Sequence, residues 1–127
     1  MKKLFALVMS FMMVLSLTGI LTACGSGGSD ENVIKIGVYE PASGDNGAGG
    51  KQETLGIEYA NSKVNKVEID GNEYTIELVE VDNQSSTDKA VSAASTLVSE
   101  GVSVVLGSYG SGVSIAAADT FADAGIP

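Results

Sequence analysis

Three apolar runs, each followed by a stretch with helical periodicity, organise the chain from residue 33 to residue 127. The runs at residues 33–39 (VIKIGVY), 76–81 and 102–106 are rich in β-branched side chains, as in strands that are covered on both faces. Stretches with helical spacing follow them at residues 51–64, between residue 86 and Gly101, and at residues 115–124. The pattern therefore predicts a strand followed by a helix, three times over.

The first predicted helix, residues 51–64, has one apolar face at the 3.6-residue period, made of Gly56, Ile57, Ala60 and Val64. A long loop, residues 40–50 (EPASGDNGAGG), precedes it, and five of its eleven residues are Gly or Pro. This loop lacks the glycine spacing of phosphate-binding and dinucleotide-binding loops. We expect it to leave room at the end of the first strand.

The later helices have recognisable ends. Ser85 or Ser86 is expected as the N-cap of the second helix, and Gly101 stands just past its end. The third helix packs through a side of small and aromatic residues, namely Ala116, Ala117, Phe121 and Ala124. Ile126 is expected to begin a fourth buried strand, so the chain resembles a piece of a larger sheet.

A hairpin is expected within the second strand unit. Residues 67–69 and 74–81 flank Asp70-Gly71, a strong signal for a two-residue turn. Three carboxylates near the end of the second arm would suit acid–base chemistry: Glu77, Glu80 and Asp82. No basic or metal-binding group converges on them, so we interpret them as an exposed strand rim.

Alternation of strands with helices predicts an α/β fold, in which a mainly parallel sheet with right-handed crossovers lies between two helical layers. The expected order of the three parallel strands is 2-1-3, with the first strand central. In such sheets ligands bind in crevices outside the carboxyl ends of the strands. The loops after residues 39, 81 and 106 are therefore expected at one edge.

Charge and composition narrow the function. The chain has 7 Lys and Arg against 16 Asp and Glu, a net charge of −9, and such a surface repels nucleic-acid phosphates. It has no histidine, which excludes His-dependent nucleophilic catalysis and imidazole metal sites within it. One cysteine excludes an internal disulfide and a multi-cysteine zinc site. We expect no enzyme activity, no metal and no cofactor.

The first 23 residues have the pattern of a secretory signal peptide. Lys2 and Lys3 precede a largely apolar stretch, residues 4–21, and small residues follow it. A transmembrane anchor is the competing interpretation, because the stretch approaches the length that spans a bilayer. The sequence Leu21-Thr22-Ala23-Cys24 resembles the bacterial lipobox, which implies cleavage before Cys24 and its lipidation. Residues 24–32 are Gly, Ser and polar after the cysteine and are expected to form a flexible tether.

The stretch at residues 107–115 (GSYGSGVSI) joins the third strand to the third helix and is the strongest candidate for a binding site. Small residues let a ligand approach the backbone, and the helix N-terminus favours an anion. Ser111 adds a hydroxyl that can donate and accept. The alternative is a plain strand-to-helix turn with Ser111 as N-cap.

These motifs together are similar to the leucine/isoleucine/valine-binding family, the type I periplasmic solute-binding proteins of ABC importers. The resemblance covers residues 33–127 and rests on Pro41-Ala42-Ser43-Gly44, Gly50, Asp82 and the segment from Gly107 to Ser111. It implies a protein of two lobes that close on a ligand. Residues 33–127 would then be an incomplete N-terminal lobe.

The resemblance also implies site residues. The Ser111 hydroxyl and the nearby backbone of Tyr109 and Gly110 would hold the carboxylate of a ligand. Family members often carry a tyrosine over the ligand side chain where this chain has Gly49, which points to a different or larger ligand. The implied function is a lipid-anchored, extracytoplasmic protein that delivers amino acids or related small carboxylates to an ABC permease.

Two other functions fit the same pattern. The fold also serves as the ligand-sensing domain of membrane receptors, and a downstream membrane span would favour that function. An exported enzyme of flavodoxin-like architecture would need a nucleophile or metal cluster outside this chain. A cytoplasmic sugar-responsive repressor is contradicted by the signal peptide and by the acidic charge.

Overall fold

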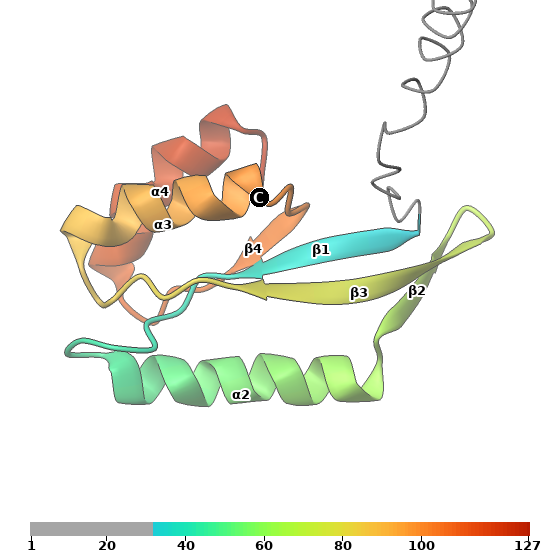
Figure 1. Ribbon diagram of the computed structural model, residues 1–127, viewed down its shortest axis with the longest axis horizontal. Helices are drawn as coiled ribbons and strands as arrows, with labels where there is room; N and C mark the ends of the chain where they lie inside the picture. The colour runs from blue at the N-terminus through green and yellow to red at the C-terminus, as the bar shows by residue number, and fades with distance from the viewer. Residues whose placement is uncertain (1–31) are drawn as a thin grey trace, which may run out of the picture. The chain divides into compact units, whose positions relative to one another are not determined.

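A mixed four-stranded sheet with helices on both faces forms the part of the chain that the computed structural model describes, residues 32–127 (Figure 1). The predictions for residues 1–23, for Cys24 and for most of the tether lie outside these residues. The elements are β1 (Val33–Val38), α2 (Gly47–Lys63), β2 (Lys66–Ile69), β3 (Asn72–Glu80), α3 (Thr87–Ser99), β4 (Val104–Leu106) and α4 (Ser111–Asp123).

The strands lie in the order β2-β3-β1-β4. β1 is central and pairs in parallel with β3 and with β4, so that Ile36 stands beside Leu78 and Val104. The predicted order 2-1-3 of the parallel strands is thus confirmed. At one edge β2 pairs antiparallel with β3, which confirms the hairpin predicted around Asp70-Gly71 and makes the mainly parallel sheet a mixed one. Asp70 and Gly71 make the tight turn with positive φ angles of 52° and 79°.

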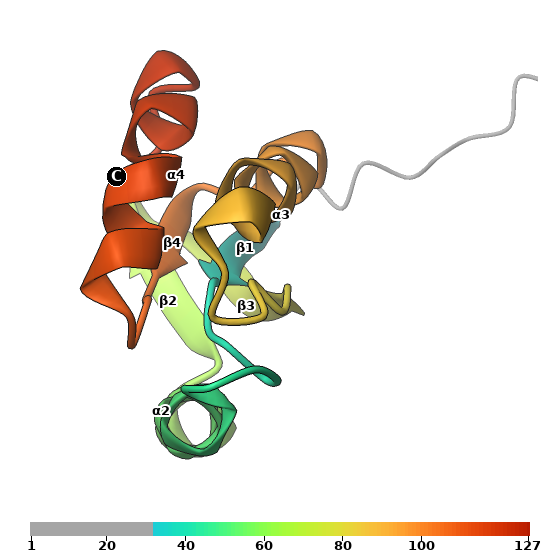
Figure 2. The ribbon, with the colours of Figure 1, turned by 90° about the vertical axis from the view of Figure 1, so that its left-hand side faces the viewer.

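The main core lies between the sheet and the layer formed by α3 and α4 (Figure 2). Small and aliphatic side chains fill it, among them Ala90, Ala94, Leu97, Val113 and Ala117, all at most 4 % exposed. Tyr39 completes the core: its ring meets Phe121 edge-on at 5.5 Å, and its hydroxyl donates to the Ala90 carbonyl at 3.1 Å. Of the four residues predicted on the packing side of α4, Ala124 is exposed.

Helix α2 covers the other face of the sheet and begins four residues earlier than predicted. Glycines are poor helix formers, but at position 50 only a glycine fits, because a Cβ there would collide with Pro41 of the preceding loop. Of the predicted apolar face only Ile57 is half-buried. The other three residues of that face line a groove of about 820 Å³ between α2 and the sheet, whose opposite side is lined by Ile36, Ile76 and Leu78.

The ends of the other elements differ slightly from the predictions. β4 spans three residues, because Val102 is buried in the core without joining the ladder. Gly101 follows α3 with a φ of 73°, as predicted for its position. At the end of the chain the Pro127 carbonyl accepts a hydrogen bond from the Val105 N–H at 2.9 Å. Among residues 32–127, none of the helices has the length and apolar character needed to cross a membrane.

Candidate functional site

The loops that follow β1, β3 and β4 meet at one edge of the sheet, as their parallel pairing predicts. Backbone hydrogen bonds join them directly: Tyr39 N–H donates to the Leu106 carbonyl at 2.8 Å, and Val81 N–H donates to the Val38 carbonyl at 3.0 Å. This edge contains the segment from Gly107 to Gly110, which we call the seat loop. It leads from β4 into the N-terminus of α4.

Three side chains from three different segments hold the seat loop. Glu40 Oε2 accepts a hydrogen bond from the Tyr109 N–H at 2.8 Å. The Asn83 amide, which is fully buried, donates to Ser108 Oγ at 2.9 Å and to the Tyr39 carbonyl at 3.0 Å. Ser114 Oγ accepts from the Ser108 N–H at 3.1 Å. The loop is therefore fixed before any ligand arrives.

Ser111 is the first residue of α4 rather than its N-cap, which corrects the alternative considered from the sequence. Gly110 takes the N-cap position, and no side chain caps the helix. The Gly110 carbonyl accepts from the N–H groups of Val113 and Ser114 at 3.0 and 3.1 Å. Within residues 32–127 the N–H groups of Ser111 and Gly112 make no hydrogen bond. These two donors and the exposed Ser111 hydroxyl are free to meet an anion.

Tyr109 and Gly49, both predicted site residues, are brought together. A Cβ on Gly49 would lie 2.6 to 2.9 Å from three atoms of the Tyr109 ring, so only glycine leaves room for the ring. The ring reaches from the seat loop to the first turn of α2 and remains 53 % exposed. Nearby, a Cβ on Gly110 would lie 3.4 Å from Asn46 Nδ2, which places that amide beside the seat loop. The structure thus gathers the predicted residues, while their contacts with a ligand stay predictions.

Glu40 belongs to the candidate site through its bond to the seat loop, and the sequence did not reveal it. The side chain is only 4 % exposed, and burial raises the pKa of its carboxyl to about 7. The hydrogen bond from Tyr109 lowers this pKa, and the neighbouring Glu53 carboxyl on α2 raises it. A charged residue directly after an apolar strand was the only signal, and it did not show that the carboxyl would be buried.

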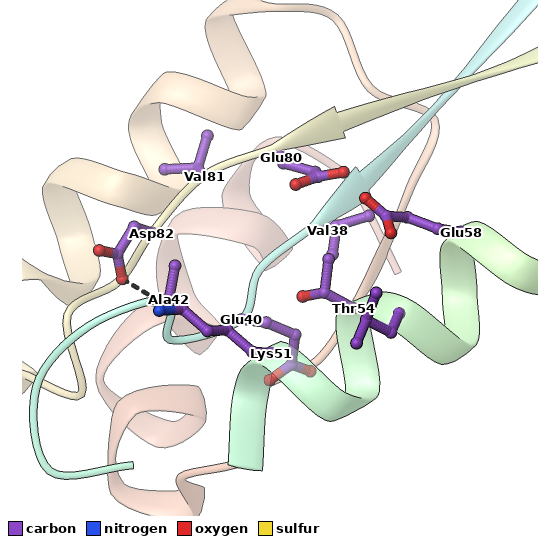
Figure 3. Close-up of a pocket in the computed structure, with 10 residues that line it drawn as sticks. Val38, Glu40, Ala42, Lys51, Thr54, Glu58, Glu80, Val81 and Asp82 are labelled. Carbon is purple, nitrogen blue, oxygen red and sulfur yellow. Dashed lines mark hydrogen bonds between the residues drawn. The ribbon is translucent and has the colours of Figure 1, made fainter. Parts of the chain in front are cut away.

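Asp82 has a structural role at the same edge. Its carboxylate accepts hydrogen bonds from Ala42 N–H at 2.8 Å, Ser43 Oγ at 2.6 Å and Gln84 N–H at 2.8 Å, and Figure 3 shows the first of these. Burial opposes ionisation, but the hydrogen bonds outweigh it and lower the pKa of Asp82. Asp82 therefore joins the loop after β1 to the turn after β3.

A pocket of about 510 Å³ lies between α2 and the ends of β1 and β3 (Figure 3). The carboxyl groups of Glu58 and Glu80 point toward one another across it. The pKa of Glu80 is raised, first by burial and then by Glu58. No group of three or more side chains that could hold a metal ion occurs among residues 32–127. The pocket is thus acidic, and it contains a second carboxyl pair between α2 and the sheet.

Comparisons with known proteins agree with this fold. The family model described as periplasmic binding protein matches residues 33–127. The chain is 35% identical over 101 residues to the Leu/Ile/Val-binding protein homolog 2 of Brucella abortus (strain 2308), a match that covers 79% of this chain and 27% of that relative. The chain therefore spans about a quarter of the length of this curated relative.

Two solved structures illustrate the same likeness. One is the branched-chain amino acid transporter substrate binding protein LivJ from Streptococcus pneumoniae in complex with isoleucine, with a TM-score of 0.66 and 35% identity over 76% of this chain and 28% of that one. The other is an ABC transporter solute binding protein from R. palustris in complex with benzoate, with a TM-score of 0.63 and 32% identity over 76% of this chain and 26% of that one.

Proposed function

The chain belongs to the periplasmic binding protein family, and from this premise we propose that it is part of an extracytoplasmic solute-binding protein of an ABC importer. Residues 33–127 form the first part of its N-terminal lobe. The fold supports this assignment, because the structural relatives are solute-binding proteins of which this chain spans about a quarter. The protein binds its ligand without chemical conversion and delivers it to a permease.

The ligand is an amino acid of the branched-chain type or a related small carboxylate. The observation that carries this proposal is the fixed seat loop before the N-terminus of α4, where the Ser111 hydroxyl and two N–H groups make no hydrogen bond within the described part of the chain. The helix dipole and the unpaired N–H donors at a helix N-terminus favour the binding of a carboxylate. The isoleucine and benzoate bound by the two solved relatives both carry one.

Replacement of Ser111 by alanine in the complete protein tests the binding role. We expect the affinity for isoleucine or benzoate to fall about tenfold, since one hydrogen bond to a charged group is lost. The melting temperature should not change, because the Ser111 side chain is exposed. Ser95→Ala, at an exposed serine of α3, is the matched control and should bind like the wild type. Equal affinities of Ser111→Ala and the wild type in calorimetry would overturn the site.

Lipid anchoring is the second part of the proposal. The lipobox-like sequence before Cys24 supports processing of the signal peptide and attachment of lipid to the cysteine sulfur, which would hold the protein at the outer face of the cell membrane. Cys24→Ser should move the protein from the membrane fraction to the soluble fraction. If the variant stays in the membrane fraction, residues 1–23 act as an uncleaved anchor instead.

A further inference from the structure

Glu40 lies where the first strand, the seat loop and helix α2 meet. Its side chain is 96 % buried, since only 4 % is exposed, yet it carries a carboxyl group. Oε2 accepts the Tyr109 N–H at 2.8 Å, and a Cβ on Gly107 would lie 2.5 Å from Oε1. The carboxylate therefore packs against the seat loop at Gly107 and at Tyr109.

The charged groups around Glu40 come from two other segments. Helix α2 contributes Lys51, Glu53, Glu58 and Lys63 to the two cavities that Glu40 lines. The end of β3 and the turn after it contribute Glu80 and Asp82. Besides Glu40 itself, four carboxyl groups and two ammonium groups thus line these cavities, and the excess of negative charge favours protonation of a carboxyl.

Glu53 is the partner that matters most among these groups. Next to burial, the Glu53 carboxyl is the neighbouring group that raises the pKa of Glu40. Glu40 thus stands between helix α2 and the Tyr109 N–H of the seat loop. A carboxylate ligand at Ser111 adds a further negative charge at the same edge and so favours the protonated form of Glu40.

We propose that Glu40 is a positioning residue of the binding site, which fixes the Tyr109 N–H of the seat loop and, through its buried carboxyl, makes the site bind carboxylates more weakly as the pH rises. This inference rests on the proposed function. Ligand binding takes up a proton from solvent onto the Glu40 carboxyl when that carboxyl is ionised. Neither the Glu40 nor the Glu53 carboxyl contacts the ligand in this arrangement.

The first experiment measures the pH profile of binding in the complete protein, with isoleucine and benzoate as probes. The wild type should bind about tenfold more weakly at pH 8 than at pH 6, as expected for uptake of up to one proton. In Glu40→Gln the amide oxygen can still accept the Tyr109 N–H, and this pH dependence should disappear, whatever the absolute affinity of the variant. Glu40→Ala removes the acceptor and should weaken binding about tenfold at every pH.

Glu80→Gln is the matched control, because Glu80 also belongs to a carboxyl pair with α2 but makes no hydrogen bond to the seat loop within the described residues. It should keep the pH profile of the wild type. The proposal is overturned if Glu40→Gln keeps that profile too, or if Glu80→Gln abolishes it.

A second measurement decides the positioning role without any ligand. In protein labelled with ¹⁵N-tyrosine, the amide signal of Tyr109 is assigned by its loss in Tyr109→Phe. This signal should titrate with a midpoint near pH 7, and the titration should vanish in Glu40→Gln. A Tyr109 amide that does not titrate overturns the inference. If neither probe binds the wild type, the proposed function fails, while the amide titration still decides the role of Glu40.

Discussion

The far end of the Tyr109 ring occupies the space in which a side chain at Gly49 would stand. Three ring atoms lie within 2.9 Å of the position of a Cβ at Gly49. Residues 60 positions apart are thus joined at the mouth of the site, one in the seat loop and one in the first turn of α2. The ring, still 53 % exposed, forms a wall beside the free N-terminus of α4.

Gly49→Ala should therefore change ligand binding more than stability. The new methyl group must displace the Tyr109 ring, which is exposed and can move into solvent at small cost. We expect the affinity for isoleucine or benzoate to change by about threefold or more, since the wall of the site moves. Calorimetric titration and the melting temperature, measured on the same samples, separate the two effects.

Tyr109→Ala is the companion variant for this prediction. It removes the ring that Gly49→Ala displaces, so the double variant Gly49→Ala/Tyr109→Ala should bind like Tyr109→Ala alone. If the effects of the two substitutions on the binding free energy are additive, Gly49→Ala does not act through the Tyr109 ring.

Elements with a local cause could be predicted from the sequence. The turn at Asp70-Gly71 follows from two residues that tolerate positive φ, and the turn forms as predicted. The three parallel strands follow from continuous β-branched runs and from the handedness of crossovers. The seat loop was identified because its small residues stand between a strand and a helix, and the structure places it at the carboxyl edge of the sheet.

Features that depend on tertiary packing could not be predicted. The start of α2 was placed too late, because the low helix propensity of glycine does not reveal that Gly50 packs against Pro41 of the preceding loop. The burial of Glu40 depends on the seat loop, 67 or more positions later in the chain. Likewise, the Tyr109 ring over Gly49 is set by the approach of two segments. None of these contacts leaves a periodic signal.

Two glycines of α2 provide a matched test of that packing. Gly50→Ala should lower the free energy of unfolding by about 1 to 3 kcal/mol, because the methyl group would collide with the Pro41 carbonyl and ring. Gly56→Ala, in the same helix, meets nothing within 4 Å and should raise it by about 0.5 to 1 kcal/mol. Urea denaturation of both variants shows whether each substitution lowers or raises the free energy of unfolding. Stabilisation by Gly50→Ala would show that α2 does not rest on Pro41.

The titration of Glu40 predicts how stability depends on pH. Its pKa is raised from 4.5 to about 7 in the folded protein, chiefly by burial, so the folded state binds this proton more tightly than the unfolded state does. The stabilisation is complete below pH 4.5 and is lost as the pH rises through 7.

Asp82 has a lowered pKa, so its own stabilisation is present above pH 3.8 and is lost as the pH falls below that value.

Glu40→Gln should separate the pH range in which Glu40 affects stability from the range in which Asp82 does. The variant cannot ionise at this position, so its melting temperature should fall less than that of the wild type between pH 5 and pH 8. Asp119→Asn, at an exposed position of α4, is the control for removal of one negative charge and should follow the wild type across this range. Thermal melts at half-unit steps of pH measure the difference. Parallel curves for Glu40→Gln and the wild type would mean that the Glu40 carboxyl remains ionised when buried, with Lys51 and Lys63 as the cations that line its two cavities.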